Sequence, residues 1–418
     1  MCNSREYIKI AAIIFFVIIL YVIIKYVNIQ NVERMIGFSG DSGIDCDGSG
    51  AQPIRAWSRN KCNYVVGDTF EKAFTDMGIT RNDGKWNLYL PCSYDNPEKE
   101  LAEMPVTVGA KYFIIDNVDT IVAKDCLWKN LVKHYGLARA SIISPRSYIL
   151  QDASDMGRFA NEYDKNKIYI MKKNIQRQEG LKITKNKDDI ISGNNKGYVI
   201  AQELLQNPYL IDGRKTNMRF YVLMICQNKN VAVYVHGNGF MYYTKGQFKK
   251  GALDTDTNIT TGYIDRNVYV KNPLTHQDLR EFLDTDDGSI CKMGGKRLYC
   301  DVEKNIRGQG LSISKVYFDR IYRLLHDIFI SFVGNVGTLE KFSGNMMFQL
   351  FGVDIAVDDQ LNPMVMEINK GPDMNAKDER DAGVKYMVVK NMLDIVNKTG
   401  SQCMLTQPLH ENMFVQVL

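Results

Sequence analysis

The sequence predicts a mixed α/β (α+β) fold, because short strand-like runs alternate with longer stretches of helical periodicity. Several short runs are rich in β-branched and aromatic residues, as strands are; they cover residues 112–116, 168–172, 198–202, 219–226 and 231–235. Three stretches carry apolar residues at spacings of three and four, as amphipathic helices do: 125–135, 315–333 and 382–397. The last two are long enough to cover a sheet face, so we expect helices packed on sheets.

Composition limits the class of protein. The chain has 418 residues, 45% hydrophobic and 24% charged, which is ordinary globular usage and enough for two or three lobes. The 52 Lys and Arg residues nearly balance the 48 Asp and Glu residues, so charge gives no case for a nucleic-acid partner. The nine cysteines are scattered and form no C-x-x-C pair, which predicts reduced structural thiols rather than a zinc site or a disulfide scaffold.

The N-terminal residues predict a membrane anchor followed by a linker. Residues 10–24 are apolar and uncharged, and the wider stretch 8–29 is about as long as a bilayer-spanning helix. A cleaved secretory signal is the alternative, but no small-residue cleavage site follows. The positive charges on the two sides are nearly equal and do not decide the orientation. Residues 30–53 include a Gly-, Ser- and Asp-rich stretch and predict a flexible linker.

The strongest local signal is a hairpin in residues 351–372, where two apolar strands flank a polar turn at 358–363. With this turn, Asp354 lies opposite Glu367, and Asn369 shares their face. Two neighbouring carboxylates repel each other unless a cation compensates, so the three oxygen-bearing side chains predict a magnesium site. The alternative is the solvent-facing side of an ordinary edge hairpin.

Two further segments are suited to phosphate. In residues 211–224, Lys215, Asn217 and Arg219 alternate with apolar residues, so that one face of the strand is cationic. In residues 168–183, Lys172 ends a buried-type strand and a polar loop follows it. The alternatives are a solvated outer strand face for the first segment and an ordinary hairpin with exposed bases for the second. No G-x-S-x-G motif or metal-type histidine pairing indicates other catalytic chemistry.

Together and in this order, these segments resemble the tubulin-tyrosine ligase and ligase-like family, whose catalytic body is an ATP-grasp fold. The resemblance runs from about residue 112 to residue 392 and is best in 123–131, 168–174, 201–223 and 351–372. Its clearest motif is Gln-x-x-x-x-x-Pro-x-x-x-Asp-Gly-Arg-Lys. The matching residues are Gln202, Pro208, Asp212, Gly213, Arg214 and Lys215.

This resemblance implies a nucleotide site. Lys172 would contact the α- and β-phosphates of ATP, Lys215 would line the nucleotide pocket and Arg219 would bind phosphate. The hinge beside adenine would be formed by Gln202, Glu203, Leu204 and Leu205. Asn217 replaces an aspartate of the family in the same pocket. The implied organisation is an N-terminal substrate-side lobe at 54–150, a central lobe at 151–225 and a C-terminal lobe at 226–418.

The resemblance also implies the catalytic and metal-binding residues. Asp354, Glu367 and Asn369 would hold the Mg²⁺ ions, two in number, that bridge the phosphates. Lys124 resembles a basic residue near the substrate channel of the family. The expected catalytic residues are therefore Lys124, Arg219 and Glu367.

The implied reaction is amide ligation: a protein carboxylate attacks ATP to give an acyl phosphate, and the amine of a free amino acid then displaces phosphate. The partners would be tubulin or another protein with an acidic tail, and the body would face the cytosol from its membrane anchor. Tyr242 stands where the family has an arginine, and Lys245 or Lys249 is expected to replace that cation. Because of Tyr242 and Asn217, an inactive nucleotide- or peptide-binding scaffold is the main alternative; an ATP-grasp ligase of a small metabolite is a third.

Overall fold

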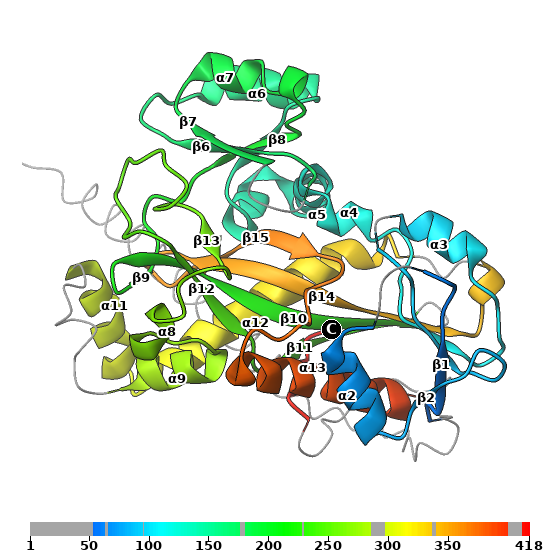
Figure 1. Cartoon of the computed structure of the whole chain (residues 1–418). Coiled ribbons are helices and arrows are strands. Elements are labelled where there is room, and N and C mark those ends of the chain that lie inside the picture. Colours follow the sequence, from blue (N-terminus) through cyan, green and yellow to red (C-terminus); the bar gives the residue numbers. More distant parts are fainter. Residues whose placement is uncertain are drawn as a thin grey trace, which may run out of the picture. The chain divides into compact units, whose positions relative to one another are not determined.

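A computed structural model of the chain describes residues 53–62, 66–94, 96–175, 180–227, 230–285, 297–336, 340–399 and 412–418. In these ranges the strands form two sheets, one of 12 strands and one of four, and helices pack on both sheets (Figure 1). The predicted mixed α/β class is confirmed. The predicted strands at 168–172 and 231–235 and the helices at 315–333 and 382–397 are present to within a few residues, whereas the run at 112–116 enters the sheet only at its start.

The large sheet is built on two long antiparallel strands, β10 (Arg214–Gln227) and β14 (Met346–Val357). The C-terminal half of β10, from Phe220 on, is buried on both faces, whereas Lys215, Asn217 and Arg219 share one face of its N-terminal half. The other antiparallel strands are β9 (Leu210–Ile211), β11 (Asn230–His236), β12 (Phe240–Thr244), β13 (Thr260–Thr261), β15 (Pro363–Asn369) and β16 (Phe414–Gln416). A parallel group completes the sheet: β1 (Ala56–Ser58), β2 (Thr80–Arg81), β3 (Leu88–Tyr89) and β4 (Lys111–Tyr112).

Helices pack on both faces of the large sheet. Phe220 of β10 packs against Phe318 of α12 (Ile313–Val333) and His276 of α9 (His276–Asp284), so these helices cover one face. Helix α13 (Glu379–Lys398) covers part of the other face, where Lys385 lies over Phe240. Further helices are α2 (Asp68–Asp76), α3 (Pro97–Glu103), α4 (Asp119–Val122), α5 (Lys124–Ile143), α8 (Val268–Lys271), α11 (Arg297–Gly308) and the short η3 (Glu340–Phe342).

The four-stranded sheet has the order β5 (Ser147–Ile149), β8 (Ile200–Glu203), β6 (Tyr169–Lys172), β7 (Leu181–Thr184), with every pair antiparallel. Tyr169 and Met171 belong to the apolar cluster that also includes Phe159 of α6 (Ala153–Glu162) and Ile190 of α7 (Lys187–Ile191). A short η2 (Asn194–Lys196) follows. Because side chains alternate along a strand, Ile170 and Lys172 point to the other face, away from these helices.

Among the described residues one pair of cysteines is oxidised, which corrects the prediction of reduced thiols for this pair. Cys62 and Cys92 form a disulfide, with Cα atoms 5.7 Å apart, whereas Cys126 and Cys226 are free. The pairing follows from the sheet: β1 and β3 are parallel neighbours, so the segments that follow them leave the sheet at the same edge. Sequence spacing alone does not reveal this proximity, because the two cysteines are 30 residues apart.

The predicted localisation, a single-pass membrane protein with a cytosolic body, is corrected. In the ranges given above, the structure contains no helix that is long and apolar enough to cross a membrane. The transmembrane helix predicted at 8–29 lies outside the described residues, as does all but the last residue of the linker predicted at 30–53.

Two buried histidines predict that stability depends on pH. His276 is fully buried, and neither of its ring nitrogens has a partner among the described residues. Burial, with a smaller contribution from Arg280, holds the pKa of His276 well below its usual value, and burial also lowers the pKa of His236. Below about pH 6.5 these rings therefore bind protons in the unfolded chain but not in the folded state. As the pH falls, each ring lowers the free energy of unfolding by up to about 1.4 kcal/mol per pH unit.

Urea unfolding at pH 7.5 and pH 5.5 measures this effect. The wild type is expected to lose stability at the lower pH, and His276→Leu is expected to reduce that loss because it removes one of the two rings. His134→Gln, at an exposed position, is the control and should leave the loss unchanged. An equal pH dependence in wild type and His276→Leu would contradict the assignment.

Candidate functional site

The side chain of Asp358 stabilises the turn between β14 and β15. The Asp358 carboxylate accepts hydrogen bonds from the backbone N–H groups of Gln360 and Asn362, both at 2.8 Å. Leu361 adopts a left-handed conformation with φ 61°, which closes the turn. Next to the turn, Val357 pairs with Pro363. The polar turn predicted at 358–363 is confirmed, but this pairing is one residue away from the predicted register.

A β-bulge corrects the register further along the hairpin. The pairing shifts by one residue between Asp354 and Ile355, and Asp354 then lies opposite Glu367 as predicted. Without the bulge, Glu367 would face Val353 and point to the helix-covered side of the sheet. The bulge therefore places both carboxylates on the open face, with Asn369 at the end of the same strand.

Arg219 lies next to these carboxylates. In the β10–β14 ladder it faces Asp354, and its guanidinium donates to both carboxylate oxygens, at 2.6 and 3.0 Å. Gly352 makes room for this geometry, because a methyl group there would lie 3.1 Å from Arg219 Nη1. Burial raises the pKa of Asp354, and the charge of Arg219 acts against this shift. Lys215 and Arg219 of the predicted cationic strand face are thus largely buried rather than in solvent.

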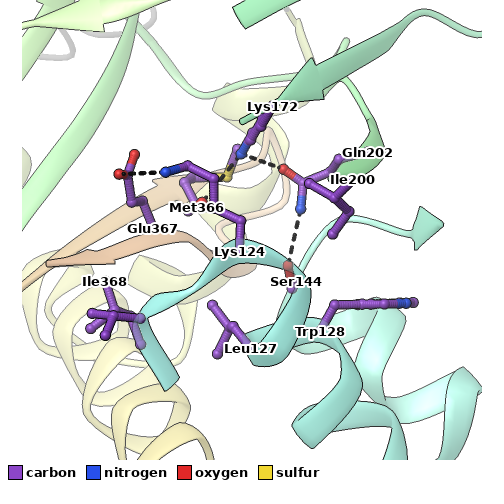
Figure 2. A pocket seen from close by; sticks show the side chains of 11 residues that line it. Lys124, Leu127, Trp128, Ser144, Lys172, Ile200, Gln202, Met366, Glu367 and Ile368 are labelled. Atoms are coloured by element: carbon purple, nitrogen blue, oxygen red, sulfur yellow. Dashed lines mark hydrogen bonds and ion pairs between the residues drawn. The ribbon is translucent and has the colours of Figure 1, made fainter. Parts of the chain in front are cut away.

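Lys124, the first residue of α5, reaches the same carboxylates from the opposite side. Its Nζ atom lies 3.1 Å from Glu367 Oε1, and Figure 2 shows the ammonium group pointing at this carboxylate. The Lys124 side chain is only 11% exposed, so the ion pair is largely shielded from water. The backbone N–H of Lys124 donates to Asn174, which ties α5 to the loop after β6. The sequence placed Lys124 near a substrate channel, and the structure places it beside Glu367.

Lys172 connects the two sheets. Its Nζ donates to Gln202 Oε1 at 2.7 Å within the small sheet and to the carbonyl oxygen of Met366 in β15 at 3.3 Å. Gln202 in turn donates to Ser144 Oγ at 3.2 Å, as Figure 2 shows. Burial lowers the pKa of Lys172 to about 8, although the charge of Glu367 opposes this shift. A buried ammonium group of this kind is suited to a bound anion.

The segment after β8 runs between the sheets and joins a second buried lysine. Lys215 Nζ donates to the carbonyl oxygen of Leu205 at 2.9 Å, and burial lowers the pKa of Lys215 to about 8. A cavity of about 520 Å³ opens beside this segment and is lined by Ile168, Glu203, Leu204, Leu205 and, from β15, Met364. Most of the other lining residues are polar or charged, so the apolar surface on which a flat heterocycle can pack is limited to Ile168, Leu204, Leu205 and Met364. Asn217 lies half-buried on the same sheet face, opposite Tyr242.

The predicted site residues fall into two adjoining groups. Lys124, Arg219, Asp354, Glu367 and Asn369 gather around the hairpin, and Lys172, Lys215 and the segment Gln202–Leu205 line the space between the sheets. Sequence reasoning missed the buried ion pair of Asp381 with Lys385 and the position of Lys377. The four-residue spacing of Asp381 and Lys385 was available as a signal, but it is equally common on exposed helix surfaces. Part of the loop after Lys172, 176–179, lies outside the described residues.

The donor set at the hairpin fits a hard cation. Two carboxylates and one amide oxygen come from adjacent positions of one sheet face, and such oxygen ligands are those that Mg²⁺ binds. In the described residues no group of three or more His, Cys, Asp and Glu side chains comes together.

Comparison with known proteins finds one matching family model and several relatives with similar names. The model of the tubulin-tyrosine ligase family matches residues 114–403. The chain is 27% identical over 266 residues to a probable beta-tubulin polyglutamylase of Tetrahymena thermophila, an alignment that covers 61% of this chain and 21% of the relative. It is 26% identical over 292 residues to a probable tubulin polyglutamylase of Caenorhabditis elegans, covering 64% of each chain. A human probable tubulin polyglutamylase is 24% identical over 299 residues, covering 67% of this chain and 45% of the relative.

The matched region contains the whole candidate site, from Lys124 to Asn369. The alignments span between about a fifth and just under two thirds of the length of these three relatives. The resemblance inferred from the motifs is thereby confirmed, and this chain belongs to the tubulin-tyrosine ligase family.

Proposed function

We propose that this chain is an ATP- and Mg²⁺-dependent ligase that joins an amino acid to a carboxylate of a protein. The observation that supports this most is that Arg219, Asp354 and Glu367 lie together on the open face of the large sheet. Lys172 of the small sheet contacts β15 of the same hairpin. We also propose the ATP-grasp arrangement, with ATP between the two sheets, and lobes at 54–150, 151–225 and 226–418.

In this proposal the chain's residues orient ATP by charge and shape. Lys172 binds the α- and β-phosphates, and Arg219 binds the γ-phosphate. The adenine ring lies beside the hinge Gln202–Leu205, above Lys215 and Asn217. Asp354, Glu367 and Asn369 would hold one or two Mg²⁺ ions, which supply charge neutralisation of the phosphates. Arg219 pairs with Asp354, and Lys124 pairs with Glu367.

The proposed reaction needs alignment more than a nucleophilic side chain. A carboxylate oxygen of the protein acceptor attacks the γ-phosphorus, the bond from this phosphorus to the β,γ-bridging oxygen breaks, and ADP leaves. The amine of the free amino acid then attacks the acyl carbon, phosphate leaves, and the amine loses a proton to water. Arg219 and Lys172 stabilise the charge that develops on the phosphates. The absence of a G-x-S-x-G motif fits this chemistry.

The relatives' names guide the choice of acceptor. Three of them are tubulin polyglutamylases by name, so we propose the acidic tail of tubulin, or another acidic protein, as acceptor. The test incubates the full chain with ATP, Mg²⁺, tubulin and one labelled amino acid at a time: glutamate, glycine or tyrosine. Label in protein together with ADP release, both dependent on Mg²⁺, is the expected result. ATP binding without transfer to tubulin or to lysate proteins would contradict a ligase.

A second candidate is an inactive scaffold that binds nucleotide or an acidic peptide. It is favoured by Tyr242, which lies where the family has an arginine, and by Asn217, which lacks the charge of the family's aspartate. The same assay separates the two functions, because a scaffold binds ATP and releases no ADP.

A further inference from the structure

The open face of the large sheet continues beyond Arg219 to an aromatic residue. Tyr242 of β12 faces Asn217 of β10, and its ring centre lies 5.3 Å from the guanidinium carbon of Arg219. Gly262, just after β13, lies next to Tyr242 on the side away from β10. A methyl group at Gly262 would lie 3.3 Å from the Tyr242 ring, so the ring and this loop border one small space.

Lys377 brings an ammonium group to the same space from the segment between β15 and α13. Its Nζ donates to the carbonyl oxygen of Gly262 at 2.9 Å, and a methyl group at Gly262 would lie 2.9 Å from this Nζ. Nζ also lies 4.2 Å from the ring centre of Tyr263, which is 80% exposed. The backbone N–H of Lys377 donates to Asp381 at 2.7 Å, which holds the segment against α13.

This position offers a cation other than the two expected from the sequence. Lys245 and Lys249 are the candidates to replace the arginine missing at Tyr242, and both are exposed, as Lys377 is. In the part of the chain that the structure describes, neither is in contact with the Tyr242 ring, whereas Lys377 borders it. The cation at this end of the cleft therefore comes from a segment more than 100 residues further along the chain.

We propose that Lys377 binds the acceptor carboxylate at the outer end of the cleft, next to Tyr242. This inference rests on the proposed function. In that function the phosphates run from Lys172 toward Arg219, and the acceptor must attack the γ-phosphorus in line, on the side away from ADP. Beyond Arg219 in this direction lie Tyr242 and then Lys377.

The local charges suit a carboxylate. An ammonium group has three N–H donors, and Gly262 accepts one of them, which leaves donors for a ligand. Burial, and next to it the charge of Lys385, lower the pKa of Lys377, while Asp381 and Asp373 oppose this shift. A bound carboxylate would stabilise the charged form of Lys377. The exposed ring of Tyr263 adds an aromatic surface on which the acceptor backbone can pack.

Peptide binding tests the inference without turnover. The full chain is titrated into a fluorescein-labelled glutamate-rich peptide, with Mg²⁺ and a non-hydrolysable ATP analogue, and anisotropy reports the Kd. Lys377→Met is expected to raise the Kd for the peptide about 10- to 100-fold. Lys377→Arg, which keeps the charge, is expected to retain most of the wild-type affinity. Lys249→Met is the matched control and should bind as the wild type does. Unfolding midpoints check that the variants fold.

Three results would overturn the inference. The first is a wild type that does not bind the peptide, and the second is equal binding by wild type and Lys377→Met. The third is a loss of affinity for the ATP analogue alone, which would assign Lys377 to the γ-phosphate. If the proposed ligase function fails while Lys377→Met still weakens peptide binding, the acceptor site stands and the chain is a peptide-binding scaffold.

Discussion

Replacing Glu367 with glutamine is expected to lower the transfer of labelled amino acid into protein by at least about 100-fold. Glutamine keeps the size of the side chain and an oxygen for Lys124, 3.1 Å away, but it removes a full negative charge from the proposed Mg²⁺ site. Burial is the main cause that raises the pKa of Asp354, and the charge of Glu367 adds to it. The stability of the fold should change little, because the variant loses both the repulsion with Asp354 and the ion pair with Lys124.

The measurement is the initial rate of transfer and of ADP release as a function of Mg²⁺ concentration. Asp359→Asn is the matched control: it removes the same charge from the turn of the same hairpin and keeps the acceptor for Asn207, 3.1 Å away. This control is expected to keep the wild-type rate. A Glu367→Gln rate close to that of the wild type, at every Mg²⁺ concentration, would remove Glu367 from the metal site.

The hairpin shows how far the sequence can lead. Its alternation and polar turn were sufficient to predict that Asp354 and Glu367 oppose each other, and this is confirmed. The predicted pairing next to the turn was one residue off, and the bulge between Asp354 and Ile355 compensated for this difference. Strand periodicity carries no signal for a bulge, because an inserted residue changes the facing of side chains without changing the composition of the strand.

Other features of the site depend on contacts between distant segments. Lys124 and Glu367 are 243 residues apart, and no local pattern connects them. Lys377 lies in a polar segment without periodicity, and its place beside Tyr242 depends on how α13 begins. The disulfide of Cys62 with Cys92 depends likewise on the parallel pairing of β1 and β3. Local alternation therefore predicted the strands and their faces, and tertiary packing determined which residues of different strands and loops meet.

Replacing Lys385 with methionine is expected to destabilise the protein by about 3–5 kcal/mol, because it leaves a buried carboxylate without its cation. Lys385 Nζ lies 3.1 Å from Asp381 Oδ2, and both side chains are at most 6% exposed. Lys385 also donates to the carbonyl oxygen of Asn375 at 2.5 Å, so the variant loses a second bond. Urea unfolding at pH 7.5 measures the loss. Lys390→Met, in a partly exposed pair with Asp394 on the same helix at the same spacing, should cost less than about 1 kcal/mol.

A double variant separates the charge of this pair from its geometry. Asp381→Leu together with Lys385→Met leaves no unpaired buried charge, so most of the lost stability should return. The position of Lys377 should not return with it, since Asp381 Oδ2 also accepts the backbone N–H of Lys377. We therefore expect the double variant to unfold near the wild-type urea concentration and still bind the glutamate-rich peptide weakly. Wild-type peptide affinity in this variant would mean that the pair contributes to stability alone, and that the segment before α13 is held in place by other contacts.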